Sequence, residues 1–321
     1  MVMKMDLGNW SAAGNAAEAG DKPLAIEARG LIKRFDGFTA VDGIDLTVEE
    51  GAIYGILGPN GAGKTTTLRM LLGIIDPDKG VRRVLGHDSP HEVAHAIGYL
   101  PEERGLYPAM RAYEAIAFVG ALRGLPLAEG RRRARLLLEE HGLGFAADRQ
   151  IRQLSKGMAQ QVQILGTLVH KPRLVVFDEP FSGLDPVNTN LIKQEIHHLQ
   201  GEGVSIIFST HRMEQVEEIC EHIVLINQGR NVLEGKVSDI KNKFKKNLYR
   251  IQFSGELPAG LETRAQIVEQ TPSGITMQVG DEAESNKLLQ YLLQHGVVVR
   301  SFNEILPTLN EIFIRQVKGG D

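Results

Sequence analysis

The chain of 321 residues contains a single cysteine, Cys220, so it cannot form an internal disulfide framework. This fits a reducing compartment, and the apolar helical pattern around Cys220 predicts a core position. No apolar run approaches the roughly 20 residues that a membrane-spanning helix needs. The first residues also lack an apolar block that could serve as the core of a signal peptide. We therefore expect a soluble protein, which needs a membrane-spanning partner if it works at a membrane.

The chain also lacks a marked excess of charge of either sign. Its 36 Lys and Arg residues nearly balance 40 Asp and Glu residues, which leaves a formal net charge of −4. This balance argues against a dedicated binder of nucleic acid or of anionic membranes. The content of 42% hydrophobic and 24% charged residues is ordinary for a globular protein.

Alternating strand and helix patterns predict an α/β fold with a parallel sheet in the main part of the chain. Residues 1–23 read as a disordered tail, and residues 24–240 as the main domain. The lysine-rich KNKFKKN at 241–247 reads as a linker. Residues 247–321 then predict a small α+β domain.

The segment GPNGAGKTT follows a predicted buried strand and precedes a predicted helix, and it fits G-x-x-x-x-G-K-[ST] without a mismatch. Its glycines let successive N–H groups turn inward around a phosphate chain, and the helix adds its positive end. We expect Lys64 to reach the β- and γ-phosphates and the Thr65 hydroxyl to hold Mg²⁺. The alternative is a glycine-rich turn that matches by chance. The predicted ATP-binding residues of this segment are Gly58, Pro59, Asn60, Gly61, Ala62, Gly63, Lys64, Thr65 and Thr66.

A second apolar strand, LVVFDE, ends in Asp178 and Glu179. An acid at the carboxyl end of a parallel strand lies beside the phosphate loop, where Asp178 would bind Mg²⁺ directly or through water. Glu179 is then placed to orient and polarise an attacking water. The alternative, an acidic pair that caps the next turn, is weakened by the phosphate loop.

Two further elements are weak when taken alone. Ser155 in LSKGM predicts the N-cap of a helix whose positive end points outward. His211 follows the strand VSIIFST, and a single histidine at a strand end is usually structural or exposed.

Taken in order, GPNGAGKTT, LSKGM, VVFDEP, SGLD and STH resemble the ATP-binding-cassette (ABC) ATPases, over residues 24–239. The resemblance implies a P-loop NTPase fold with an antiparallel β subdomain and a helical subdomain at about residues 104–170. It implies that Phe35 stacks on adenine and that His211 contacts the γ-phosphate. Catalysis would then fall to Glu179, His211 and Lys64.

The same resemblance implies that Ser155 and Gly157, with Lys156 between them, contact the γ-phosphate bound by the opposite subunit. The residues that would link the two sites are Ser182, Gly183, Leu184 and Asp185. The resemblance implies that each site is completed in trans, and this chain has one phosphate loop and one signature helix. We expect a head-to-tail dimer with two ATP molecules, formed with an identical or a second ATPase subunit.

Two positions depart from the family pattern. Glu102 stands where a glutamine is usual, and it can still offer an oxygen to Mg²⁺ although it adds a negative charge. LSKGM replaces L-S-G-G-Q, so Lys156 adds positive charge and Met158 lacks the amide. Both variants resemble a subgroup of exporter subunits with PEERGLYP and LSKGM, and we expect activity to persist.

The string HEVAH at 91–95 matches the H-E-x-x-H zinc signature. The stretch is short and no pattern for a third ligand follows it. An exposed pair, His91 and His95, is therefore the preferred interpretation, and we expect no zinc.

These observations predict the ATPase subunit of an ABC transporter, an exporter by its subgroup, with Mg²⁺ as cofactor. Its partner would be an integral membrane permease, and it would lie at the cytoplasmic face of the membrane. The C-terminal PTLNEIF resembles an accessory domain of that subgroup. A soluble ABC ATPase without a transporter is the main alternative, and a P-loop kinase the second. The sequence does not identify the transported substrate.

Overall fold

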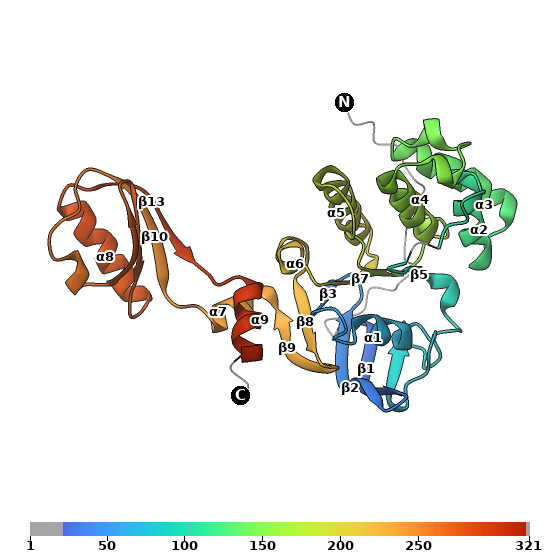
Figure 1. Ribbon diagram of the computed structural model, residues 1–321, viewed down its shortest axis with the longest axis horizontal. Helices are drawn as coiled ribbons and strands as arrows, with labels where there is room; N and C mark the ends of the chain where they lie inside the picture. Colours follow the sequence, from blue (N-terminus) through green and yellow to red (C-terminus); the bar gives the residue numbers. More distant parts are fainter. Residues whose placement is uncertain (1–21, 104, 319–321) are drawn as a thin grey trace. The chain divides into compact units, whose positions relative to one another are not determined.

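The computed structural model describes residues 22–103 and 105–318, which divide into a larger unit that ends at Gly235 and a smaller unit that starts at Lys236 (Figure 1). This division falls a few residues before the predicted domain end at residue 240. Residues 1–21 of the predicted N-terminal tail lie outside the described residues.

The larger unit is built on a six-stranded sheet with the order β5-β6-β7-β3-β8-β9. The five neighbouring strands β5, β6, β7, β3 and β8 pair in parallel. All residues of β3, β6 and β7 are buried, which is why these strands read as continuous apolar runs. Their carboxyl ends therefore meet at one edge of the sheet. The strands are β3 (Ile53–Leu57), β5 (Ile97–Leu100), β6 (Leu174–Asp178), β7 (Ser205–Thr210), β8 (His222–Asn227) and β9 (Arg230–Lys236).

A three-stranded antiparallel sheet with the order β2-β1-β4 shares a core with this sheet. Strands β1 (Leu24–Phe35) and β2 (Phe38–Glu49) are joined by Asp36 and Gly37, which both have positive φ, as a tight hairpin turn requires. The edge strand β4 (Lys79–Val84) was not predicted.

Helices connect and cover the central sheet. They are α1 (Lys64–Leu71), α5 (Pro186–Gly201) and α6 (Met213–Ile219). Cys220 is buried as predicted, but it follows α6 in extended conformation instead of lying within the helix.

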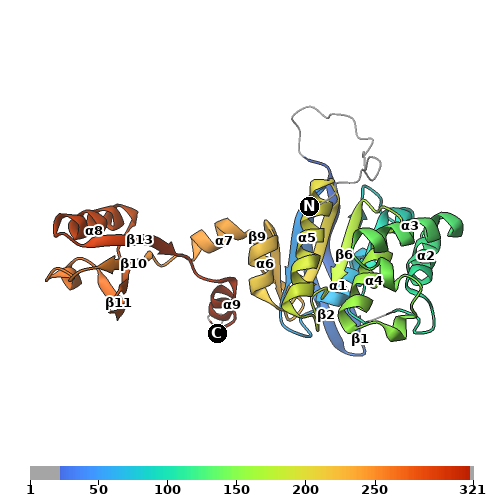
Figure 2. The same ribbon diagram turned by 90° about the horizontal axis from the view of Figure 1, so that it is seen from above.

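Three helices form a second cluster with its own apolar core. They are α2 (Ala112–Leu122), α3 (Leu127–Glu140) and α4 (Lys156–Leu168). Figures 1 and 2 both show them grouped at one end of the larger unit. Short 3-10 helices lie at Ala94–Ala96, Gly144–Ala146 and Ile151–Gln153.

The smaller unit has a four-stranded antiparallel sheet with the order β11-β12-β10-β13, built around the side chains of Ile251 and Met277. Its elements are α7 (Val237–Lys243), β10 (Leu248–Ser254), the 3-10 helix Leu261–Thr263, β11 (Gln266–Thr271), β12 (Gly274–Gln278), α8 (Glu282–Gln294), β13 (Val298–Ile305) and α9 (Leu309–Lys318).

The predicted linker is partly helical. Val237 and Ile240 are buried on one face of α7, and its lysines lie in the last turn, where they complement the helix dipole. None of the described helices has the length and apolar character needed to span a bilayer.

Candidate nucleotide-binding site

The loop of residues 58–63 joins β3 to α1 at the carboxyl edge of the central sheet. Gly58 (φ 153°) and Gly63 (φ 104°) adopt backbone conformations that favour glycine. A Cβ atom at Gly58 would lie 2.1 Å from the Ile226 carbonyl oxygen, and one at Gly63 would lie 2.5 Å from that of Ala40. The loop therefore packs too closely on its neighbours for side chains at these two points. Its geometry presents backbone N–H groups and the N-terminus of α1 to an anion.

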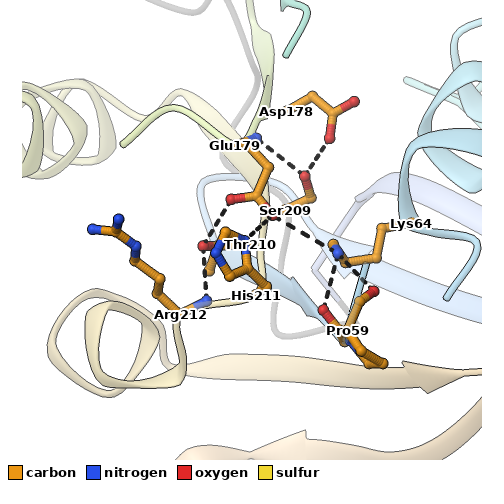
Figure 3. A network of polar contacts seen from close by, with 9 residues as sticks. Pro59, Lys64, Asp178, Glu179, Ser209, Thr210, His211 and Arg212 are labelled. Atoms are coloured by element: carbon orange, nitrogen blue, oxygen red, sulfur yellow. Dashed lines mark hydrogen bonds and ion pairs between the residues drawn. The ribbon is translucent and has the colours of Figure 1, made fainter. Parts of the chain in front are cut away.

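Lys64 is buried and its ammonium group lies over this loop. Nζ donates to the carbonyl oxygens of Gly58 at 2.9 Å and Pro59 at 3.1 Å, and it lies 3.8 Å from Glu179 Oε1 (Figure 3). Burial lowers the pKa of Lys64, while the negative charges of Glu179, Asp178 and Glu102 oppose that shift. The structure thus brings four predicted site residues within electrostatic reach of one another.

Asp178 is 1% exposed at the end of β6. Its Oδ1 accepts a short hydrogen bond from Ser209 Oγ, and its Oδ2 is buried without a hydrogen-bond partner among the described residues. A buried carboxylate oxygen without a partner is costly. Such an oxygen fits a hard divalent cation or a water bound to one.

Glu179 has a left-handed backbone with φ 50°, which costs about 1 kcal/mol for a residue with a side chain. Its N–H points at Ser209, 3.1 Å from the carbonyl oxygen and 3.2 Å from Oγ. Oε1 lies 2.8 Å from His211 Nδ1, and Oε2 accepts from Thr210 Oγ1 at 3.1 Å (Figure 3). Because an ionised carboxylate only accepts, Nδ1 carries the proton in this contact. The contacts with Ser209, Thr210 and His211 therefore stabilise the left-handed backbone and the side-chain position of Glu179.

The sequence pattern did not single out Ser209 and Thr210 as site residues. Both are fully buried at the end of β7. Figure 3 shows the Ser209 hydroxyl beside Asp178 and the backbone nitrogen of Glu179, and the Thr210 hydroxyl between Glu179 and Arg212. The sequence feature that could have identified them is a pair of adjacent hydroxyl residues at the carboxyl end of a strand that is apolar at its centre.

The signature residues lie at the start of α4. Ser155 is its N-cap, as predicted, and its Oγ accepts from the Met158 N–H at 3.2 Å. A Cβ at Gly157 would lie 2.7 Å from Nδ2 of Asn188, which donates to Asp185 Oδ2 at 2.6 Å. The signature helix thus packs on the residue that is bonded to Asp185. Within the described part of the chain, no hydrogen bond or ion pair joins Ser155, Lys156 or Gly157 to the network around Glu179.

The other predicted site residues range from exposed to buried. Phe35 is 45% exposed, with Lys33 Nζ 5.7 Å from its ring centroid. Of the remaining loop residues, Asn60 and Gly61 are exposed, and Pro59, Thr65 and Thr66 are partly buried. Ala62 is buried. Ser182 and Gly183 are exposed, Leu184 is partly buried, and Asp185 caps α5 by accepting from the Asn188 N–H at 2.9 Å.

His91 and His95 are both exposed; His95 lies within the 3-10 helix Ala94–Ala96, and His91 precedes it. The part of the chain that the structure describes contains no group of three or more His, Cys, Asp or Glu side chains arranged to hold a metal ion.

Two family descriptions match the chain. Residues 41–182 match the family described as ABC transporter. Residues 235–317 match the C-terminal domain of DrrA1-3-like ATP-binding proteins. Among solved structures, an ATP-binding subunit of an ABC transporter has a TM-score of 0.63 and 29% identity, and covers 68% of this chain and 93% of its own. CbiO1 of Clostridium perfringens has a TM-score of 0.61 and 27% identity, and covers 69% and 94%.

Curated relatives agree with these matches. The chain is 38% identical over 289 residues to the uncharacterized ABC transporter ATP-binding protein YhaQ of Bacillus subtilis, covering 89% of this chain and 96% of YhaQ. It is 33% identical over 301 residues to the daunorubicin/doxorubicin resistance ATP-binding protein DrrA of Streptomyces peucetius, covering 90% and 91%. It is 37% identical over 218 residues to the linearmycin resistance ATP-binding protein LnrL of B. subtilis, covering 67% and 70%. The chain belongs to the ATP-binding subunits of ABC transporters, and its activity is the hydrolysis of ATP coupled to transport.

Proposed function

We propose that the network of Lys64, Asp178, Glu179 and His211 is the hydrolytic half-site of this ATPase. The observation that carries the proposal is the burial of a lysine and two acids at the end of the phosphate loop, with His211 on Glu179. Lys64 would leave the two loop carbonyls for the β- and γ-phosphates of ATP. Glu179 would then orient an attacking water and accept its proton, while His211 would contact the γ-phosphate.

Mg²⁺ fits the oxygen groups around Lys64. Thr65 at the start of α1, Asp178 with its unpaired buried oxygen, and Glu102, whose charge acts on Lys64, are all hard oxygen donors. Bound with ATP, the ion would neutralise charge on the phosphates. A test is Glu102→Gln. Removing one negative charge that faces the phosphates should make the binding free energy of ATP more favourable by about 1 kcal/mol. This change lowers KM for ATP about fivefold, and turnover should be retained. An unchanged KM would place Glu102 outside the site, and a raised KM would show that its oxygen contributes more to Mg-ATP binding than its charge opposes.

The active unit would be a head-to-tail dimer. The exposed signature residues Ser155 and Lys156, with Gly157, lie outside the Glu179 network of their own chain, so they are available to a second phosphate site. The partner would be a second copy or another ATPase subunit. Asn188 is hydrogen-bonded to Asp185 of the loop of residues 182–185, and it accepts from Gln161 Nε2 of the signature helix at 3.2 Å. The helix and the loop would therefore enter the interface together.

A mixing experiment tests the shared site. Lys64→Ala removes one phosphate loop and Ser155→Arg blocks one signature, so each variant alone should be inactive. In a mixed dimer, the intact loop of one chain meets the intact signature of the other. The mixture should therefore regain hydrolysis. If both variants are inactive and their mixture remains so although mixed dimers form, the shared-site proposal fails.

The transport partner would be a membrane permease that holds this subunit at the cytoplasmic face of the membrane. Tyr107 and Leu122, which are 57% and 69% exposed, provide apolar contact area on the helical cluster. The names of DrrA and LnrL, both resistance proteins, support export as the direction. A tagged chain should pull down a stoichiometric multi-span protein from gently solubilised native membranes. Recovery of soluble proteins only, with the chain absent from the membrane fraction, would favour a soluble ATPase.

A further inference from the structure

Thr210 lies between Glu179 and the start of α6, and it is 1% exposed. Its Oγ1 donates to Glu179 Oε2 at 3.1 Å and accepts from the Arg212 N–H at 3.1 Å. A hydroxyl has one hydrogen to donate. Because the Arg212 N–H already points at the oxygen, the hydrogen of Thr210 is directed to Glu179. The backbone at the N-cap of α6 thus fixes the orientation of this hydroxyl.

His211 occupies the other oxygen of the same carboxylate, with Nδ1 2.8 Å from Oε1. Lys64 Nζ also lies 3.8 Å from Oε1, whereas Thr210 is the hydrogen-bond partner of Oε2. With partners on both oxygens, the plane and the rotamer of the Glu179 carboxylate are both defined (Figure 3). His211 is also expected to contact the nucleotide, whereas Thr210 is buried behind the carboxylate.

Ser209 holds the backbone of the same residue. Its Oγ lies 3.2 Å from the Glu179 N and donates to Asp178 Oδ1, and its carbonyl oxygen accepts from the same N–H at 3.1 Å. Ser209 therefore fixes the left-handed turn at Glu179, and Thr210 fixes the side chain. The two adjacent hydroxyls of β7 constrain both acids of the site.

We propose that Thr210 is a positioning residue for Glu179: its hydroxyl, oriented by the Arg212 N–H, keeps the carboxylate in the geometry that activates the attacking water. The proposal rests on the proposed role of Glu179 as the base. It assigns Thr210 an effect on turnover and none on nucleotide binding.

The test is Thr210→Val, which keeps the shape of the side chain and removes the hydroxyl, with Thr210→Ser as the matched control that keeps it. In the assembled transporter, Thr210→Val should lower kcat about tenfold, which corresponds to 1.36 kcal/mol in the barrier, with KM for ATP within about twofold. Thr210→Ser should stay within about twofold of the unchanged protein in both constants. If Thr210→Val does not fold, as judged by its melting temperature, Thr210→Ala is measured in its place.

A double variant separates positioning from a general structural role. With Glu179→Gln, kcat should already be lost, and adding Thr210→Val should leave the affinity for a fluorescent ATP analogue unchanged. Equal kcat for Thr210→Val and Thr210→Ser would overturn the proposal, as would an effect confined to KM or a loss of analogue binding in the double variant. If Glu179→Gln itself kept full turnover, the role of Glu179 would fail first. If Glu179→Gln were inactive while Thr210→Val stayed fully active, only the proposal that Thr210 positions Glu179 would fail.

Discussion

Replacing Gly58 by alanine should disrupt the phosphate loop by an amount that the geometry allows us to calculate. A Cβ there would lie 2.1 Å from the Ile226 carbonyl oxygen, which belongs to the backbone of a buried strand. Overpacking of this kind costs about 1–3 kcal/mol. The backbone at φ 153° adds about 1 kcal/mol, because this region is essentially restricted to glycine. We therefore expect Gly58→Ala to lower the free energy of unfolding by about 2–4 kcal/mol.

Gly61 provides the matched control in the same loop. Its φ is 78°, but a Cβ there would meet nothing within 4 Å. Gly61→Ala should therefore cost only the backbone term of about 1 kcal/mol. Urea denaturation of the nucleotide-free protein, followed by circular dichroism, measures both costs. Equilibrium dialysis should also show that Gly58→Ala weakens ATP binding more than tenfold, because the loop must shift. Equal midpoints for the two variants would refute this account of the loop.

Two further predictions follow from buried titratable groups. Burial lowers the pKa of His170 to about 4, so between pH 6.5 and 4 the unfolded chain binds more protons than the folded one. The free energy of unfolding should fall across that window as the pH falls, by up to about 3 kcal/mol. The variant His170→Asn should flatten the curve. Burial also raises the pKa of the Cys220 thiol, which is 7% exposed. Ellman's reagent at pH 8 should react with it far more slowly in the folded chain than in urea, and equal rates would contradict its burial.

The sequence predicted the strands and helices that bury long apolar stretches. LVVFD and SIIFST are buried at every position, so their patterns follow directly from the packing. The strands β4 and β11 escaped prediction because most of their residues are exposed and polar at the edges of their sheets. Such strands are stabilised by pairing with a neighbour, which a local pattern does not contain.

The predictability of the site has the same physical basis. Lys64, Asp178 and Glu179 follow from strand ends and loop spacing, because parallel strands bring their carboxyl ends to one edge. The roles of Ser209 and Thr210 depend on the left-handed backbone of Glu179. Pro180 follows Glu179, and a residue before proline is normally extended, so local rules predict a different conformation there. The contacts that stabilise it are tertiary and invisible in the sequence.

The packing of Asn188 against the signature helix was also beyond the sequence. Its partners, Gly157 and Asp185, belong to separate motifs, and only the fold of α4 beside α5 brings them together. A side chain at the glycine of the signature would therefore displace the side chain of Asn188 in its own chain, in addition to any effect on a contact with ATP.

The central claim is that two chains share each ATP, and the mass of Glu179→Gln in solution tests it most directly. Without hydrolysis, the variant should hold ATP between two protomers. Light scattering at saturating Mg-ATP should give twice the 35.3 kDa of the single chain for the purified subunit alone. With the permease as a second condition, the complex should contain two copies of the chain. Adding Ser155→Arg to the variant should return it to the mass of one chain. A single-chain mass for Glu179→Gln under both conditions, or a dimer that Ser155→Arg leaves intact, would contradict the shared site.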